Sequence, residues 1–310
     1  MAVRRGLEVP VVERSNSTKS VSQAIDLGRM QPYSIGVASA SVTLGKHPPL
    51  PIIALICYGQ TYGLWNDFSP FFSPFMQLAP FFPLIHKVLR PTFPTCLWTG
   101  DANSATIALT FDDGPHPTHT PQLLEVLDRY EIPASFFWLG ACVHRSPHMA
   151  QEIWQRGHWI GLHGYQHHSF PRLSADELKQ SLAKTQEAIA HACQVDLAYV
   201  QQNIRDVRPP NGLFTPQTLR YLQQWNYRPV MWSVVPEDWV RPGIDIVTQR
   251  VLSQTCNGSL IVLHDGYCGG EDVAKTADRL IPRLLDQGYQ FVTVDALWQQ
   301  AAIGVPVVKT

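Results

Sequence analysis

From residue 105 onward, apolar β-rich runs alternate with helical patterns, and this alternation limits the fold more than any other feature. We predict strands over residues 105–111, 134–139, 158–163, 205–209, 228–234, 259–264 and 290–294. Helical patterns follow these runs over residues 121–130, 147–156, 175–192, 216–225, 245–255, 272–287 and 295–302. Repeated strand–helix units build a parallel sheet covered by helices, most simply a closed or nearly closed β/α barrel.

Capping residues mark the start of several predicted helices. Thr120-Pro121 and Thr215-Pro216 each place a hydroxyl side chain at the N-cap and a proline at the first helical position. Ser174 stands three residues before Glu177, which is the spacing of a capping box.

Length and composition bound the domain organisation. The chain of 310 residues has room for one large domain of roughly 200–250 residues and an extension, or for two domains of about 150 residues. We assign residues 105–302 to the domain of alternating strands and helices, residues 76–104 to a lead-in segment and residues 303–310 to a tail. Apolar residues make up 45% of the chain and the formal net charge is −1, so the whole chain is neither disordered nor basic. We therefore predict no nucleic acid partner.

Residues 1–75 lack the alternating pattern, and we expect a poorly ordered extension there. Arg4 and Arg5 are not followed by the apolar core of a secretory signal, so no clear signal peptide is visible. Residues 68–85 are rich in phenylalanine but repeatedly interrupted by proline. They fit a peripheral membrane or cell-wall contact, or an irregular wrap over an apolar face of the main domain. A third interpretation is that the biological start is Met76, directly before a short helix over residues 80–89.

Two adjacent carboxylates, Asp112 and Asp113, follow the first apolar run and precede Gly114 and Pro115. Neighbouring strand residues point to opposite faces, so both acids reach one site only where the strand ends and the backbone turns. Two close carboxylates repel each other unless a cation, a proton or an arginine lies nearby. In a β/α barrel, reactive residues gather at the carboxyl ends of the strands, where we expect the partners of these acids.

Two histidines mark the end of the third predicted strand. His163 ends this strand and His167 follows four residues later, a spacing that suits two ligands on one turn. Two imidazoles, one carboxylate and an open coordination position form a catalytic zinc-like site. We therefore predict that Asp113, His163 and His167 bind a divalent metal. The alternative is that these histidines are simply polar loop residues. That alternative suits a lone His-x3-His pair, but it is less favoured here because two carboxylates end a neighbouring predicted strand.

Further reactive side chains follow the fourth, fifth and sixth predicted strands. Arg208, in a proline-rich turn, can pair with Asp112 and keep it ionised. His264 stands at the tip of a buried strand, and Asp238 follows the strand before it. A carboxylate beside this imidazole would orient it and raise its pKa, as a general acid requires.

In this order, the motifs resemble those of the polysaccharide deacetylase family, also called the NodB homology domain or carbohydrate esterase family 4. The family's TFDDGP motif is present unchanged at Thr110–Pro115. Its H-[ST]-x-x-H motif corresponds to His163–His167, with Gly164 in place of the hydroxyl residue. The R-x-P-[YF], D-x-x-D-W and L-x-L-x-H-type motifs correspond to Arg208–Asn211, Val235–Trp239 and Leu260–His264. The resemblance covers about residues 105–300.

The resemblance implies a distorted (β/α)7 barrel, TIM-barrel-like, that removes N-acetyl groups from a glycan containing N-acetylglucosamine, such as peptidoglycan, chitin or an exopolysaccharide. It implies Zn²⁺, or another divalent metal such as Co²⁺, as cofactor. Asp112 would be the general base, oriented by Arg208. His264 would be the general acid that protonates the leaving amine, and Asp238 would tune it.

The resemblance also implies a substrate-binding set. Pro210 and Asn211 lie in the third motif, and the backbone N–H of Asn211 would help to stabilise the oxyanion. Trp239 and Leu263 would form an apolar slot for the acetyl methyl group. The family's usual location favours an extracytoplasmic or cell-envelope protein, and no partner protein is predicted.

Two positions in this sequence depart from the family pattern. Asn211 replaces the usual aromatic residue, and Val235 replaces the first acid of the fourth motif. We expect activity to survive, because residue 211 contributes through its backbone and Asp238 is kept. Two alternatives stay open: an O-acetyl esterase or small-amide hydrolase on the same scaffold, and a catalytically silent glycan-binding module.

Overall fold

The computed structural model describes residues 79–303. These residues belong to one of the two units into which the chain divides, residues 49–310. The predictions for residues 1–75, for a start at Met76 and for the tail after residue 303 lie outside the described residues. Between residues 79 and 303, no helix combines the length and the apolar character needed to cross a bilayer.

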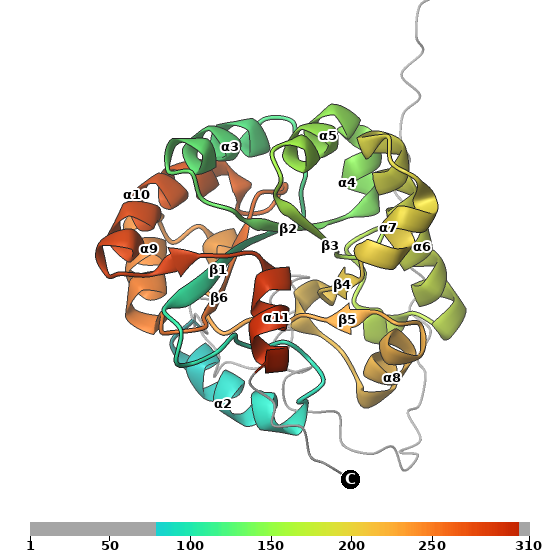
Figure 1. Ribbon diagram of the computed structural model, residues 1–310, viewed down its shortest axis with the longest axis horizontal. Helices are drawn as coiled ribbons and strands as arrows, with labels where there is room; N and C mark the ends of the chain where they lie inside the picture. The colour runs from blue at the N-terminus through green and yellow to red at the C-terminus, as the bar shows by residue number, and fades with distance from the viewer. Residues whose placement is uncertain (1–78, 304–310) are drawn as a thin grey trace, which may run out of the picture. The chain divides into compact units, whose positions relative to one another are not determined.

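A single parallel sheet lies at the centre of the described residues (Figure 1). Its strands are β1 (Thr106–Asp112), β2 (Ser135–Trp138), β3 (Trp159–Leu162), β4 (Asp206–Val207), β5 (Arg228–Pro229), β6 (Leu260–His264) and β7 (Gln290–Phe291). The strand order is β5-β4-β3-β2-β1-β6, and β7 pairs with β1. The predicted α/β architecture is therefore confirmed, and each strand falls within or within one residue of its predicted range.

The sheet curls, and its later strands are shorter than predicted. β4 ends at Val207, close to Pro209, whose nitrogen carries no hydrogen to donate to a ladder. β5 ends at Pro229 because the next residue, Val230, bridges to Leu97 of the lead-in segment. Beyond it, Val234 forms an isolated parallel bridge to Ile261 of β6. Single bridges thus replace the long ladder predicted over residues 228–234, and the result is a curled, irregular sheet.

Helices surround the sheet (Figure 1). They are α2 (Phe82–Thr92), α3 (His119–Arg129), α4 (Gly140–Arg145), α5 (Pro147–Gln155), α6 (Ala175–Cys193), α7 (Leu197–Asn203), α8 (Pro216–Gln224), α9 (Ile244–Gln254), α10 (Val273–Asp286) and α11 (Val294–Ile303). α2 confirms the predicted lead-in helix. The predictions omitted α4 and α7, which are too short to show a helical period. α7 nevertheless has a local signal, because the Asp196 side chain caps it by accepting the N–H groups of Ala198 and Tyr199.

Two of the three predicted caps are present. Ser174 and Glu177 form a capping box at the start of α6, and Thr215 caps α8. The cap predicted at Thr120 is wrong, since α3 begins at His119 and Thr120 lies inside it. The Thr120 hydroxyl instead donates a hydrogen bond to Asp265. The Thr120 hydroxyl, which the local pattern assigned to capping, therefore binds a residue far away in the sequence.

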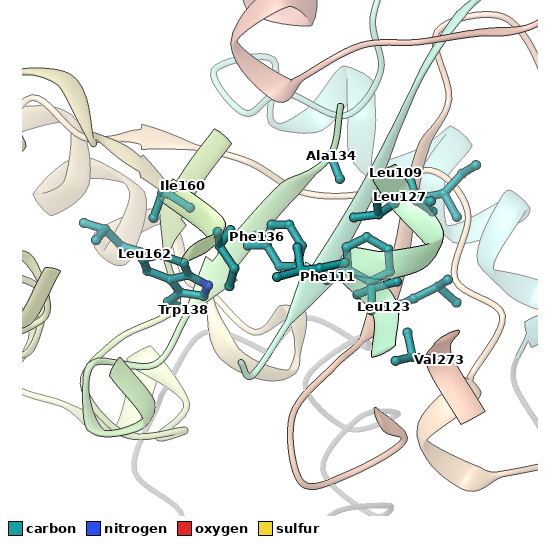
Figure 2. Packing of buried hydrophobic residues seen from close by; sticks show 14 of the residues in the cluster. Leu109, Phe111, Leu123, Leu127, Ala134, Phe136, Trp138, Ile160, Leu162 and Val273 are labelled. Atoms are coloured by element: carbon teal, nitrogen blue, oxygen red, sulfur yellow. The ribbon is translucent and has the colours of Figure 1, made fainter. Parts of the chain in front are cut away.

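The main core lies between the sheet and its outer helices. Leu109 and Phe111 of β1 pack with Phe136 of β2 against Leu123 and Leu127 of α3, and all five are fully buried (Figure 2). Because side chains alternate along a strand, the even-numbered residues of β1 face the other side of the sheet. That inner side is where the polar residues of the candidate site lie.

Candidate active site

The carboxyl ends of β1 and β6 bring the first reactive residues together. In the parallel register, Asp112 pairs with His264, and the backbone N–H of Asp265 donates to the Asp112 carbonyl at 3.2 Å. Asp112 also pairs with Phe137 at the end of β2. Residues far apart in the sequence therefore meet at one edge of the sheet, as parallel strands require.

A buried ion pair holds Asp112. The Arg208 Nη1 atom lies 2.6 Å from Asp112 Oδ1, and both residues are almost fully buried. The same guanidinium donates to the hydroxyl of Thr110 at 2.8 Å and to the carbonyl of Met231 at 3.0 Å. Its Cζ lies 4.0 Å from the centre of the Phe137 ring. Burial lowers the pKa of Arg208, and the adjacent Asp112 charge opposes that effect.

Asp113, His163 and His167 converge in the manner predicted for a metal site. Both histidine Nε2 atoms lie 3.5 Å from Asp113 Oδ1, and one candidate ligand atom from each residue lies within 4.8 Å of the others. His163 Nδ1 is 2.7 Å from the carbonyl oxygen of Arg208, an arrangement that makes Nδ1 the protonated nitrogen and turns the Nε2 lone pair toward Asp113. Burial lowers the pKa of His163 to about 3, so this ring stays neutral, as a ligand must.

The fit of this set to a divalent cation rests on one atom in particular. Asp113 Oδ1 is buried and has no hydrogen-bond partner among residues 79–303. A buried carboxylate oxygen without a donor is costly unless a cation satisfies it. One carboxylate and two imidazoles are ligands that zinc accepts, and they leave a coordination position open.

A sharp backbone turn sends the two acids to different partners. Asp113 has a φ of 71°, in the left-handed region that aspartate tolerates better than most residues. Gly266 lies directly against it, since a Cβ on this glycine would sit 2.4 Å from the Asp113 Cβ. The turn predicted from Gly114 and Pro115 therefore begins one residue earlier, at Asp113 itself.

Gly164, where the family pattern has a hydroxyl residue, is supported by a neighbouring helix. It adopts a φ of 85°, which glycine adopts without strain. The Ser181 hydroxyl of α6 accepts the N–H of Tyr165 at 2.8 Å. It also lies 3.4 Å from the point that a Cβ on Gly164 would occupy. The Ser181 hydroxyl of α6 thus lies beside residue 164, where the family motif has a serine or threonine.

The Asp238 carboxylate contacts His264 at two atoms. One carboxylate oxygen accepts the backbone N–H of His264 at 2.7 Å, and the other lies 2.8 Å from Nδ1. Burial alone would lower the pKa of His264, but the charge and hydrogen bond of Asp238, followed by the charges of Asp113 and Asp112, outweigh it and raise the pKa to about 9. The Trp239 ring lies edge-on to the imidazole, with centroids 5.1 Å apart.

The proposed substrate residues of the third motif lie in the short 3₁₀ turn η4 (Pro210–Gly212). Pro210 is buried, whereas Asn211 is partly exposed. Asn211 has φ 58° and ψ 13°, a left-handed conformation that asparagine adopts readily. Its side-chain amide donates to the Ser169 hydroxyl at 2.9 Å. The residue that replaces the usual aromatic therefore joins two loops through a hydrogen bond.

The structure does not bring Leu263 and Trp239 together. Leu263 is fully buried in the core that the sheet shares with its outer helices. Val262 belongs to the other face of β6, and it lies in the cluster of buried residues against which Trp239 packs. Because residues two apart on a strand share a face, Val262 lies on the same side as His264. The two-residue period of a strand alone indicates that Leu263 and His264 lie on opposite faces of β6.

Motif matching also left out Asp265, which follows His264 directly. It is fully buried, it accepts the Thr120 hydroxyl, and a Cβ on Gly114 would lie 2.4 Å from its Oδ1. Burial, opposed by the Thr120 hydrogen bond and reinforced by the charge of Asp113, raises the pKa of Asp265 to about 7. Asp265 therefore fills the space behind the turn that carries the two acids.

Comparison with known proteins places this chain in a family. Residues 99–230 match the model of the polysaccharide deacetylase family. A peptidoglycan-N-acetylglucosamine deacetylase from Bacillus cereus is 32% identical over 216 residues, which are 69% of this chain and 97% of the relative. The chain belongs to the polysaccharide deacetylase family. The family resemblance predicted from the motifs is thereby confirmed.

Two further polysaccharide deacetylases extend the comparison. A chitooligosaccharide deacetylase from Sinorhizobium fredii is 33% identical over 195 residues, covering 59% of this chain and 87% of the relative. The crystal structure of a peptidoglycan N-acetylglucosamine deacetylase bound to an N-hydroxybenzamide compound superposes with a TM-score of 0.62 at 30% identity. The superposed region covers 66% of this chain and 93% of the chain in that crystal structure. Both sequence and fold therefore agree on the family.

Proposed function

We propose that the protein is a metal-dependent hydrolase that removes N-linked acetyl groups from a glycan containing N-acetylglucosamine. The observation that carries this proposal is the meeting, at one sheet edge, of the Asp113–His163–His167 set with the Asp112–Arg208 and Asp238–His264 pairs. The names of the relatives support an N-deacetylase acting on peptidoglycan or chitooligosaccharides.

Asp113, His163 and His167 would hold the cofactor, for which we propose Zn²⁺, with Co²⁺ as a functional substitute. A cation bound there supplies Lewis acidity, which polarises an acetyl carbonyl and lowers the pKa of a water molecule. The hydrogen bond from His163 Nδ1 to the Arg208 carbonyl fixes the ring orientation. That contact would increase the basicity of the ligand, as outer contacts of metal-bound histidines commonly do.

Asp112 acts as the general base. Its Oδ1 is held by Arg208, so the carboxylate cannot rotate freely when it takes a proton from the attacking water. Thr110 and Met231 hold the arginine in turn. A base held by an arginine that is itself fixed loses little entropy on reaching the transition state, which is the advantage of preorganisation.

His264 acts as the general acid on the leaving amine. With Asp238 on Nδ1, the Nε2–H is the proton available to the substrate. A pKa of about 9 keeps the imidazolium populated near neutral pH. The two roles are thus divided between an acid that a carboxylate holds and a base that a guanidinium holds.

The remaining proposed contacts bind the acetyl group. The backbone N–H of Asn211 would donate to the developing oxyanion. Trp239, with Val262 in place of Leu263, would face the acetyl methyl group. We also propose that the irregular sheet is a distorted (β/α)7 barrel and that the protein works outside the cytoplasm or at the cell envelope, where such glycans lie.

Acetate release by the purified protein with Zn²⁺ tests the function across peptidoglycan, chitooligosaccharides and acetylxylan. We expect release from at least one N-acetylated glycan, and release slower by about 10²-fold or more from an Asp112→Asn variant. Release from acetylxylan alone would instead make the protein an O-acetyl esterase. Glycan binding without release from any substrate would make it a silent binding module.

A further inference from the structure

A buried acid stands directly before Asp238. Glu237 is fully buried and adopts φ 59° and ψ 48°, a left-handed conformation unusual for glutamate. It precedes the 3₁₀ turn η5 (Asp238–Val240), which carries the proposed partner of His264. A charged side chain that is wholly buried in a strained loop needs compensating contacts to stay there.

Two elements outside the family motifs supply such contacts. The backbone N–H of Ala79, at the start of the described residues, donates to Glu237 Oε2 at 2.9 Å. Arg250 of α9 lies 3.6 Å from the same oxygen and donates to the carbonyl of Pro236 at 2.8 Å. Gln254 of α9 donates to the Ala79 carbonyl at 3.3 Å. The lead-in segment and α9 therefore meet at the Glu237 carboxylate.

Aromatic packing also holds the segment that leads into this loop. Phe82 of α2 packs edge-on to Trp232, with centroids 5.3 Å apart, and Trp98 packs on Trp232 at 5.8 Å. Val235, which replaces the first acid of the fourth motif, is buried in this apolar cluster. Ala79 and Phe82 lie before residue 99, where the match to the family model begins.

We propose that Glu237 is a positioning residue that ties the Asp238 loop to α9 and to the lead-in segment, and so holds Asp238 against His264. The inference rests on the proposed function of His264 as general acid. Asp238 contacts two atoms of His264, the backbone nitrogen at 2.7 Å and Nδ1 at 2.8 Å, so a small movement of the loop breaks both contacts. The lead-in segment then belongs to the catalytic unit, although Ala79 and Phe82 lie outside the residues that match the family model.

Glu237→Gln in the full chain is the primary test. The substitution keeps the shape and removes the charge, and it leaves the amide facing Arg250. We expect kcat to fall about 10-fold, as misplacement near a reacting group does, with a smaller effect on KM. We also expect the alkaline limb of the pH–rate profile to move down by about one pH unit, because His264 loses part of the Asp238 contact. The other charges near His264, those of Asp112 and Asp113, stay in place.

Glu152→Gln is the matched control. Glu152 lies in α5 and pairs with Arg156 at the surface, so its loss removes one negative charge without touching the loop contacts. We expect wild-type kcat and pH dependence for this variant. Arg250→Met is a second variant, for use if Glu237→Gln does not fold. It releases the loop from the helix side and should shift the same limb in the same direction.

A readout independent of turnover separates this inference from the proposed function. The pKa of His264, followed by NMR of the imidazole, should fall in Glu237→Gln even if no glycan is hydrolysed by the wild type. A lower melting temperature with unchanged kcat, alkaline limb and His264 pKa would reduce Glu237 to a purely structural role and overturn the inference. Absence of acetate release by the wild type, with the NMR shift present, would overturn the function and leave the positioning role standing.

Discussion

The clearest quantitative prediction concerns Asp238→Asn. In the structure the pKa of His264 is raised from 6.5 to about 9, and Asp238 is the strongest of the groups that raise it. That difference corresponds to roughly 3 kcal/mol in favour of the imidazolium. Without the carboxylate charge, burial opposes protonation and the pKa falls to 6.5 or below. At pH 8 the protonated fraction then drops from roughly nine-tenths to roughly 3%, a loss of roughly 30-fold in active enzyme.

The assay is the pH dependence of kcat/KM for acetate release. A cation on Asp113 would offset one of the charges that raise the His264 pKa, so the wild-type limb in the loaded enzyme should lie below 9. The difference in pH between the alkaline limbs of the wild type and of Asp238→Asn should remain. Asp245→Asn, which removes an exposed carboxylate from α9, is the control and should leave the limb unchanged. Coincident alkaline limbs for wild type and Asp238→Asn would refute the reasoning.

The same ion pair links stability to pH. Because the folded pKa of His264 lies above its unfolded value, the pair stabilises the fold fully below pH 6.5, and this stabilisation is lost as the pH rises through about 9. The metal-free wild type should therefore lose stability across that window in denaturant titrations. A wild type whose unfolding free energy stays flat between pH 6.5 and 9 would contradict the assigned pKa.

Three further predictions test the rest of the site. Asp112→Asn should lower kcat by about 10²-fold or more, because it removes the general base, while circular dichroism shows an intact fold; near-normal turnover would exclude this role. Chelation should abolish acetate release and Zn²⁺ or Co²⁺ should restore it, so activity that survives chelation would rule out the metal site. Leu263→Ala should destabilise the protein by about 2–5 kcal/mol in denaturant unfolding with an unchanged KM, whereas Val262→Ala should raise KM; the reverse pattern would return Leu263 to the substrate slot.

The sequence predicted most of the sheet and the site, because both depend on local signals. Apolar runs located the strands, and the carboxyl-end rule for parallel strands brought Asp112, His163 and His264 to one edge. The ends of β4 and β5 were not predictable from apolar character alone. They depend on the proline at residue 209 and on Leu97, which lies far from β5 in sequence.

What the sequence missed depends on contacts between distant segments. Nothing local indicates that the Thr120 hydroxyl binds Asp265 rather than capping α3, or that Ser181 stands beside Gly164. The same holds for Glu237, whose partners come from the lead-in segment and α9. A motif records which residue types recur, and it does not record which neighbours hold them in place.

Arg208 shows why the base and the metal ligands act as one unit. Its guanidinium holds Asp112, while its backbone carbonyl holds His163 Nδ1. The two contacts use different parts of one residue, so the position of the peptide after β4 sets both at once. Because Thr110, Met231 and Phe137 fix the guanidinium from three elements, the arginine cannot follow one partner without straining its contacts to the others. The neighbouring acids Asp112 and Asp113 therefore keep separate partners, one on the arginine side chain and the other facing a histidine that the arginine backbone orients.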